Sequence, residues 1–341
     1  MSLQFDTIIQ YLTWRCNSKC ITCSIWRGEI KKSNDEILKI ESLKKIYSNV
    51  KAKIVYLTGG EVSLKENFVE IAEIIHRTSG ARISFATNGI LIDKIKRDVL
   101  LLKKKKIPFD ISLSCNGFQQ IHDFSRNIVG NYQKIENLIY FLKKNNITFS
   151  LSYTAFPFNI QETIPFFHYW RSRGVDIIMG IGRMDSRYGD LDGNQGFTKF
   201  SSKDLRELET ILQKLSHIYP EYLPQYYLIR NINNGQTIFP CYGLIKKIVI
   251  DSDGNVYPCD GLVADLCLGN LKDYDLSLIN LFQQNSNKVE EIKNIIISKK
   301  CQPCFYTCDL IDGIKRDLSW KDLKKIYKSR IKFKLRRIFK A

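Results

Sequence analysis

The sequence predicts an α/β protein: an incomplete barrel of six β/α units, then a small cysteine-rich α+β domain and a basic C-terminal helix. Three observations lead to this prediction. Short β-rich runs alternate with helical periodicity up to residue 182, which is typical of a parallel sheet with crossover helices. A cysteine-rich region with a hairpin pattern follows, and the last twenty residues are basic with apolar residues at helical spacing.

The β-rich runs predict strands, and the segments between them predict helices with one apolar face among charged residues. The predicted strands are Ile8–Thr13, Lys53–Thr58, Arg82–Thr87, Phe109–Ser114, Thr148–Thr154 and Val175–Ile181. The predicted helices include Asp35–Tyr47, Phe68–Thr78, Ile92–Lys105 and Tyr132–Lys144. In an incomplete barrel the functional groups lie at the carboxyl ends of the strands and on the loops that follow them.

The composition changes after Gly182, where Gly, Asp and Ser become frequent. Ser201–His217 then predicts a helix capped by Ser202. Lys247–Asp251 and Asn255–Pro258 predict a hairpin around an Asp-Gly turn. We therefore expect a barrel domain, a cysteine-rich domain and a C-terminal helix, with boundaries at 1–217, 218–312 and 313–341.

Length and composition indicate the broad class of protein. With 341 residues and 44% hydrophobic content, the chain can bury a sizeable core without disulfides. Its ten cysteines do not suggest a disulfide framework, because such frameworks belong mainly to short secreted domains and no export signal is recognisable. No apolar run approaches the roughly 20 residues that span a membrane. We expect a soluble cytoplasmic protein with reduced thiols, and a peripheral membrane location is the open alternative.

The formal net charge is +17, and much of it lies in Lys321–Lys340. This segment predicts a basic amphipathic helix, because apolar residues recur there every fourth position: Leu323, Tyr327, Ile331, Leu335 and Phe339. Two interpretations stay open. The apolar stripe packs on the body of the protein, or the helix binds an anionic membrane surface or an acidic partner.

The most specific motif is Cys16, Cys20 and Cys23, a Cys-x3-Cys-x2-Cys array directly after the first predicted strand. Iron–sulfur clusters usually take four thiolates, so three leave one iron without a protein ligand. The alternatives are a structural zinc site and unpaired core cysteines. Zinc is disfavoured because its sites typically use four ligands in two pairs.

At these residues the chain resembles the radical S-adenosylmethionine superfamily, whose hallmark is this triad on a partial (β/α)6, TIM-like barrel. The resemblance implies a [4Fe-4S] cluster whose open iron binds S-adenosylmethionine. It also implies reductive cleavage of that molecule to a 5′-deoxyadenosyl radical, which abstracts a hydrogen atom from a substrate. A low-potential electron donor such as flavodoxin or ferredoxin is the implied partner.

Further motifs of this family follow at successive strand ends: Gly59-Gly60-Glu61, Thr87-Asn88-Gly89 and Ser114-Cys115-Asn116-Gly117, with His122-Asp123 and Arg126 behind them. The resemblance implies that Gly59, Gly60 and Glu61 hold the methionine ammonium. It also implies that Asn88, Ser114 and Arg126 belong to the same site, with Arg126 at the carboxylate. An ordinary surface ion pair is the alternative for Arg126. We expect His122 and Asp123 to shape the loop and Cys115 to be a buried apolar residue.

A second set of cysteines lies near the C-terminus: Cys241, Cys259, Cys301, Cys304 and Cys308, with Gly254 in the first gap. This set resembles the SPASM and Twitch extensions of radical S-adenosylmethionine enzymes. The resemblance implies one auxiliary [4Fe-4S] cluster held by Cys241, Cys259, Cys301 and Cys304. Cys308 replaces one of these, joins Cys267 at a second, incomplete cluster, or is a free thiol. A zinc site stays open as the alternative.

Pro258-Cys259-Asp260 is similar to a sequence of the anaerobic sulfatase maturases, and this similarity implies that Asp260 is a catalytic base. The alternative is an aspartate that solvates a turn.

The predicted function is radical modification of a peptide or protein side chain, with the auxiliary cluster aiding oxidation or substrate positioning. The alternative within the same class is a dehydrogenase or epimerase of a small sugar, polyol or envelope-related molecule. A non-catalytic zinc-binding or nucleic-acid-binding protein is the competitor from another class. It does not explain why three motifs lie at successive strand ends, and nucleic acid is therefore not expected as a partner.

Overall fold

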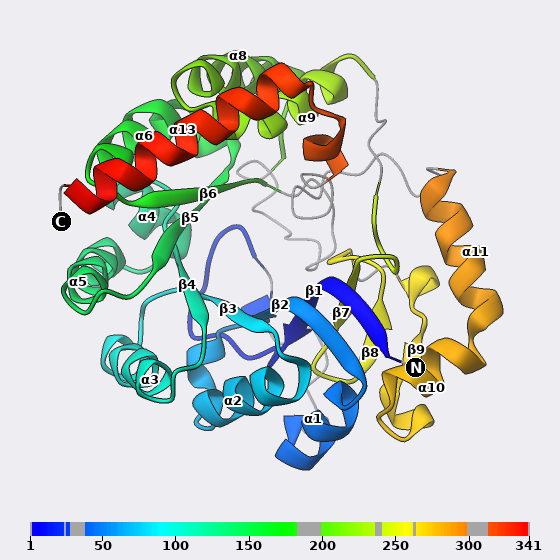
Figure 1. Cartoon of the computed structure of the whole chain (residues 1–341). Coiled ribbons are helices and arrows are strands. Elements are labelled where there is room, and N and C mark those ends of the chain that lie inside the picture. Colours follow the sequence, from blue (N-terminus) through cyan, green and yellow to red (C-terminus); the bar gives the residue numbers. More distant parts are fainter. Residues whose placement is uncertain are drawn as a thin grey trace.

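The structure is a computed structural model that describes residues 2–23, 25–27, 38–182, 199–235, 241–261, 264–298 and 313–339. The described residues form one curved nine-stranded sheet in the order β6-β5-β4-β3-β2-β1-β7-β8-β9, with helices on its outer face (Figure 1). The strands are β1 (Leu3–Tyr11), β2 (Val50–Thr58), β3 (Arg82–Thr87), β4 (Phe109–Ser114), β5 (Phe149–Ala155), β6 (Asp176–Ile181), β7 (Lys247–Ile250), β8 (Asn255–Tyr257) and β9 (Gly269–Asn270).

The six predicted strands are confirmed, and neighbours from β1 to β6 pair in parallel. β1 and β2 begin earlier than the sequence predicts. The added residues include two charged ones, Asp6 and Lys51, and Lys53 Nζ lies 2.8 Å from Asp6 Oδ1 at the amino-terminal end of the sheet. At this end of the sheet Leu3 pairs with Val50.

The predicted helices are also confirmed, and several further ones are present. The helices are α1 (Ile40–Tyr47), α2 (Phe68–Ser79), α3 (Ile92–Lys104), α4 (Gln119–Arg126), α5 (Asn131–Lys144), α6 (Thr163–Ser172), α8 (Ser202–Ile218), α9 (Leu223–Asn233), α10 (Leu278–Gln284), α11 (Ser286–Ile297) and α13 (Trp320–Phe339). The predicted start of the first helix, Asp35, lies outside the described residues. The prediction of Ser202 as a cap is wrong: Ser201 Oγ accepts from the Asp204 backbone N–H at 3.1 Å, and the Asp204 carboxylate accepts from the Ser201 N–H at 2.7 Å.

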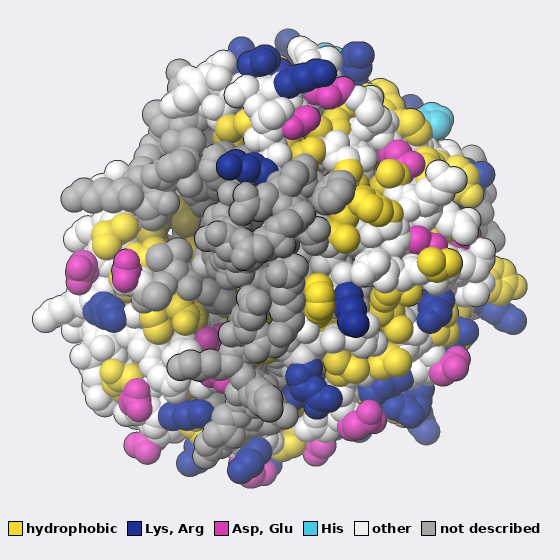
Figure 2. All heavy atoms as spheres, turned by 180° about the vertical axis from the view of Figure 1, so that it is seen from behind, with side chains coloured by type: hydrophobic (Ala, Val, Ile, Leu, Met, Phe, Trp, Pro, Cys, Tyr) yellow, Lys and Arg dark blue, Asp and Glu magenta, His cyan; other side chains and the backbone are white. Residues whose placement is uncertain are grey.

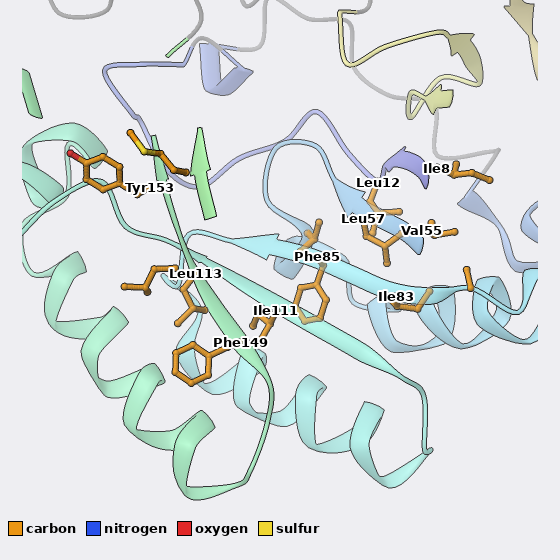
Figure 3. Packing of buried hydrophobic residues seen from close by; sticks show 14 of the residues in the cluster. Ile8, Leu12, Val55, Leu57, Ile83, Phe85, Ile111, Leu113, Phe149 and Tyr153 are labelled. Atoms are coloured by element: carbon orange, nitrogen blue, oxygen red, sulfur yellow. The ribbon is translucent and has the colours of Figure 1, made fainter. Parts of the chain in front are cut away.

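The main core lies between the sheet and its helices. Alternate strand residues point to that side and are fully buried, among them Val55, Ile111 and Leu113 (Figure 3). The other side of the strands is more polar. Ser112 Oγ and Ser150 Oγ lie 3.0 Å apart on this side, and Arg82 on β3 forms an ion pair with Asp110 on β4. The concave face of the sheet therefore offers hydrogen-bonding groups, whereas the convex face supplies the packing.

The predicted hairpin is confirmed, but it does not form a sheet of its own. β7 pairs in parallel with β1, and β8 pairs antiparallel with β7 through Val249 and Tyr257. The Gly254 N–H donates to the Asp251 carbonyl at 3.2 Å and closes the turn. The cysteine-rich region thus continues the barrel sheet beside β1, while the predicted domain boundaries stay predictions.

The predicted C-terminal helix is confirmed as α13, and the residues of its predicted apolar stripe differ in exposure. Leu323 is half-buried, whereas Tyr327, Ile331 and Leu335 are exposed. The position of the Phe339 side chain lies outside the described residues. Within the part of the chain that the structure describes, none of the helices combines the length and the apolar composition needed to cross a bilayer.

Truncation of a buried strand residue tests this packing. Leu113 in β4 is fully buried, and Leu113→Ala should lower the free energy of unfolding by about 2–5 kcal/mol because it leaves a cavity. The matched control is Leu100→Ala in α3, where the side chain is 41% exposed and the loss should be below about 1 kcal/mol. Chemical denaturation measures both values, and equal losses would contradict the described core.

Candidate functional site

The loop of residues 12–23, here called the cysteine loop, is attached to the carboxyl end of β2. The Gly60 N–H donates to the Thr13 carbonyl at 2.7 Å, and the Glu61 N–H donates to the Arg15 carbonyl at 2.9 Å. A Cβ added at Gly60 would collide with the Arg15 carbonyl oxygen. Gly59 has a φ of +128°, and a Cβ added there would collide with the Thr13 carbonyl oxygen. Both glycines are therefore required by the close approach of the two backbones.

The end of α4 holds the cysteine loop from another side. The Ile21 N–H donates to the Ser125 carbonyl at 3.1 Å, and Ser18 Oγ donates to the Arg126 carbonyl at 3.4 Å. Ser18 Oγ also lies 3.0 Å from Cys20 Sγ. Arg126 Nη1 donates to the same sulfur at 3.5 Å. The loop is thus attached to β2 and α4, which belong to different parts of the barrel.

The three cysteines of this loop form no disulfide within the described residues. Burial raises the pKa of the Cys16 thiol to about 11 and that of Cys23 to about 12, and the charges of the neighbouring cysteines oppose ionisation further. Thiolates at these positions need positive charge nearby. Arg126 supplies one such charge, and among the described residues its buried Nε has no hydrogen-bond partner.

This donor set fits an iron–sulfur cluster. The loop carries three thiols, and beside it lies the guanidinium of Arg126, whose Nε has no partner among the described residues. The charge of Glu61 raises the pKa of Cys16 further, so thiolates there depend on added positive charge. Iron ions supply the charge that buried thiolates require. Among the described residues, no three or more His, Cys, Asp or Glu side chains are arranged to hold a single metal ion.

Glu61 is buried at the centre of a hydrogen-bond network. Its Oε1 accepts from the Ser63 N–H at 3.1 Å and from Thr87 Oγ1 at 2.6 Å. Its Oε2 accepts from the Asn88 N–H at 2.8 Å. A carboxylate has about four acceptor positions, so Oε2 keeps room for one further donor. Glu61 therefore joins the ends of β2 and β3 and can still accept from a ligand.

Asn88 extends this network to the cysteine loop. Its Nδ2 donates to Asn17 Oδ1 at 2.8 Å and lies 4.0 Å from Cys16 Sγ. Gly59, Gly60, Glu61, Asn88 and Arg126 are thus brought together around the loop, as the sequence predicts. Ser114 lies half-buried at the carboxyl end of β4. That these residues hold a cofactor stays a prediction.

His122 and Asp123 shape the structure behind the site. His122 Nδ1 accepts from the Asn116 N–H at 3.2 Å, so its Nε2 carries the proton donated to Asn131 Oδ1 at 2.9 Å. Burial lowers the pKa of His122 to about 3, which keeps the ring neutral. The Asp123 carboxylate accepts two backbone N–H groups at the start of α5, and Cys115 is fully buried in the core. These structural roles are as predicted.

Two side-chain contacts that the sequence does not reveal connect the cysteine loop region to the hairpin. Tyr11 OH donates to Asp260 Oδ1 at 2.6 Å, and both residues are buried. Trp14 Nε1 donates to Asp253 Oδ2 at 3.1 Å. Asp260 therefore lies beside the carboxyl end of β1. Tyr11 and Trp14 carry no motif, and 249 residues separate Tyr11 from Asp260 in the chain.

The structure describes part of the second cysteine set. Cys241 and Cys259 are half-buried, and Gly243 packs so closely on Pro258 that an added Cβ would lie 2.8 Å from its carbonyl oxygen. This contact brings the segments of the two cysteines together. Cys267 lies beside Tyr257 on β8. The remaining predicted ligands lie outside the described residues: Cys301, Cys304 and Cys308.

A single methyl group tests the attachment of the cysteine loop. Gly60→Ala should displace the loop from β2 and lower the iron content after reconstitution from about eight to about four per chain, because only the auxiliary site remains. Gly80→Ala is the control: its φ of +75° costs about 1 kcal/mol, but no atom lies within 4 Å of an added Cβ. Full iron content in Gly60→Ala would refute the required close approach.

Two family models match the chain. Residues 11–169 match the radical SAM superfamily, and residues 241–309 match SPASM, an iron–sulfur cluster-binding domain. The cysteine-type anaerobic sulfatase-maturating enzyme of Clostridium perfringens strain 13 is 26% identical over 317 residues, 85% of this chain and 83% of the relative. A probable GTP 3′,8-cyclase of Saccharolobus islandicus is 24% identical over 271 residues, 73% of this chain and 80% of the relative.

Solved structures show the same fold. The structure of histidine-tagged anSMEcpe with bound AdoMet (S-adenosylmethionine) has a TM-score of 0.65 at 21% identity, covering 99% of this chain and 94% of that chain. Native anSMEcpe with AdoMet and the Cp18Cys peptide has a TM-score of 0.64 at 22% identity, covering 99% and 98%. The radical SAM and SPASM domains both indicate [4Fe-4S] clusters. The partial barrel, the cysteine loop and the two family matches agree, and the chain therefore belongs to the radical SAM superfamily as an enzyme with a C-terminal SPASM domain.

Proposed function

We propose that this enzyme cleaves AdoMet reductively to a 5′-deoxyadenosyl radical and uses it to take a hydrogen atom from a peptide or protein side chain. One observation carries the proposal. Three cysteines, the Glu61 network and the half-buried Arg126, whose buried Nε has no partner among the described residues, lie around a single loop. This combination supplies cluster ligands, an acceptor for an ammonium group and a donor for a carboxylate within one site.

The chain's residues have distinct roles in this proposal. Cys16, Cys20 and Cys23 hold one [4Fe-4S] cluster, and the second cysteine set holds the auxiliary one. When bound, the first cluster supplies the electron that breaks a carbon–sulfur bond of AdoMet, and the auxiliary cluster supplies an acceptor for an electron lost by the substrate. Glu61 Oε2 accepts from the ammonium of AdoMet, and Arg126 donates to its carboxylate.

Asp260 removes a proton from the substrate after the hydrogen atom has left. The short bond from Tyr11 OH stabilises the charged carboxylate and fixes its orientation. Loss of one hydrogen atom, one proton and one electron leaves the substrate oxidised by two electrons. The hydrogen atom converts the radical to 5′-deoxyadenosine, and Asp260 retains the proton.

Two comparisons favour a peptide substrate. The relative from Clostridium perfringens is named as a cysteine-type sulfatase-maturating enzyme, and a structure with the same fold holds a peptide named Cp18Cys beside AdoMet. A small sugar or polyol stays the alternative substrate. Flavodoxin or ferredoxin is the proposed electron donor.

Substitution of the loop cysteines tests the cleavage. Cys16→Ala, Cys20→Ala or Cys23→Ala should each abolish the formation of 5′-deoxyadenosine from AdoMet by the reduced, reconstituted protein, because each removes a cluster ligand. Cys115→Ala is the control, since this cysteine is fully buried in the core and should leave the product unchanged. Chromatography of the nucleoside measures the outcome. Unchanged product in the three loop variants would rule out the proposed cluster site.

Substitution at Asp260 tests the proton transfer. Asp260→Asn should lower the rate of peptide oxidation about 100-fold or more, while 5′-deoxyadenosine still forms. Tyr11→Phe should lower the rate about tenfold, since it removes one hydrogen bond to a charged group. Asp253→Asn is the control, because Asp253 is a carboxylate of the hairpin that accepts from Trp14 and has no proposed part in the proton transfer. A full oxidation rate in Asp260→Asn would exclude this residue as the base.

A further inference from the structure

We propose that the outer face of α13 binds the surface of an anionic lipid bilayer. The helix lies along the outside of the barrel near α6 and α9 (Figure 1). Its two faces have different chemistry, and only one of them is used to hold the helix on the body of the protein.

The inner face of α13 supplies that attachment. Ser329 Oγ donates to Glu221 Oε2 at 2.7 Å, and Tyr227 OH donates to Asp322 Oδ2 at 3.4 Å. The guanidinium of Arg171 in α6 lies over the Phe333 ring, 3.5 Å from its centroid. The attachment of the helix therefore does not require the apolar residues on its other side.

The outer face carries an exposed apolar stripe. Trp320 is 88% exposed, Tyr327 68%, Ile331 40% and Leu335 48%. Their separations of seven, four and four residues place them on one side of the helix. Exposed apolar side chains are ordinary when scattered, but four in line on one helix form a surface that lowers its free energy by leaving water.

Basic residues flank this stripe along the whole helix. The exposed ones are Lys321, Lys324, Lys325, Lys328, Arg330, Lys332 and Lys334. The one acidic residue of the helix sequence, Asp322, accepts from Tyr227 of the body and pairs with Lys325, whose Nζ lies 3.3 Å from its Oδ1. By contrast, acidic side chains lie among the basic ones on the face that Figure 2 shows. The outer face of α13 thus combines apolar contact with an excess of positive charge.

This combination matches an anionic bilayer better than another polyanion. An interfacial helix lies in the membrane plane, buries its apolar stripe at the acyl boundary and directs lysine side chains outward to the phosphates. Trp and Tyr side chains are enriched at that depth. A nucleic acid or an acidic peptide would pair with the lysines but would leave the apolar stripe in water.

Flotation of the reconstituted full-length protein with vesicles tests the proposal. The protein should bind vesicles of phosphatidylcholine mixed with phosphatidylglycerol and should bind pure phosphatidylcholine far more weakly. Lys324→Gln with Lys328→Gln should weaken binding roughly 25-fold, about fivefold for each charge. Ile331→Ser with Leu335→Ser should weaken it about tenfold or more.

Matched variants elsewhere on the surface control for general effects. Lys104→Gln with Lys214→Gln removes the same charge from exposed positions of α3 and α8 and should bind like the unmodified protein. Val129→Ser removes a side chain that is 96% exposed, again without effect. Formation of 5′-deoxyadenosine should be unchanged in all these variants, so failure of the membrane proposal is distinguishable from failure of the cleavage proposal.

Tryptophan fluorescence identifies the bound face. Anionic vesicles should shift the emission of the protein to shorter wavelength, and Trp320→Phe should remove that shift while binding persists. Binding that is indifferent to the outer-face substitutions would overturn the proposal. So would a bound protein whose Trp320 emission does not move, or a protein that binds polyglutamate or RNA but no vesicle.

Discussion

Two backbone hydrogen bonds from the end of β2 to the cysteine loop determine the geometry of the site. The Gly60 and Glu61 N–H groups donate to the carbonyls of Thr13 and Arg15, and only glycine permits the two chains to approach so closely. Attached in this way, the loop presents its thiols to Arg126 on α4, while the Glu61 carboxylate remains fixed by β3. Without this attachment the groups of the site would not be held close together, because they come from four separate strand ends.

A second constraint joins the two cysteine regions. β7 lies beside β1 in one sheet, and Tyr11 and Trp14 bond to Asp260 and Asp253 across the junction. The proposed base is therefore positioned by the same strand that leads into the cysteine loop. In the proposed reaction the substrate loses its hydrogen atom and its proton at neighbouring positions, so a proton acceptor with a fixed orientation is useful there.

Local patterns predicted the parallel strands, the turn of the hairpin and the motifs at strand ends. The periodicity of apolar residues, the conformation of glycine and the spacing of cysteines can each be recognised within a few residues of the sequence. They did not predict Tyr11 or Trp14, whose partners are remote in the chain, nor the partners of Glu61, which depend on the pairing of β2 with β3. Helix α13 was predicted with one apolar stripe. Within that stripe Leu323 is half-buried while Tyr327 and Ile331 are exposed, a difference that depends on tertiary packing and not on the local pattern.

The proposed chemistry depends on an iron–sulfur cluster at the cysteine loop that has one open iron. Electron paramagnetic resonance of the reduced full-length chain carrying Cys241→Ala and Cys259→Ala measures it directly, because only the cluster at the cysteine loop should remain. Addition of AdoMet should change the spectrum of that cluster, and AdoMet labelled at its amino nitrogen should add a hyperfine coupling. A spectrum that AdoMet leaves unchanged would contradict an open iron at this loop.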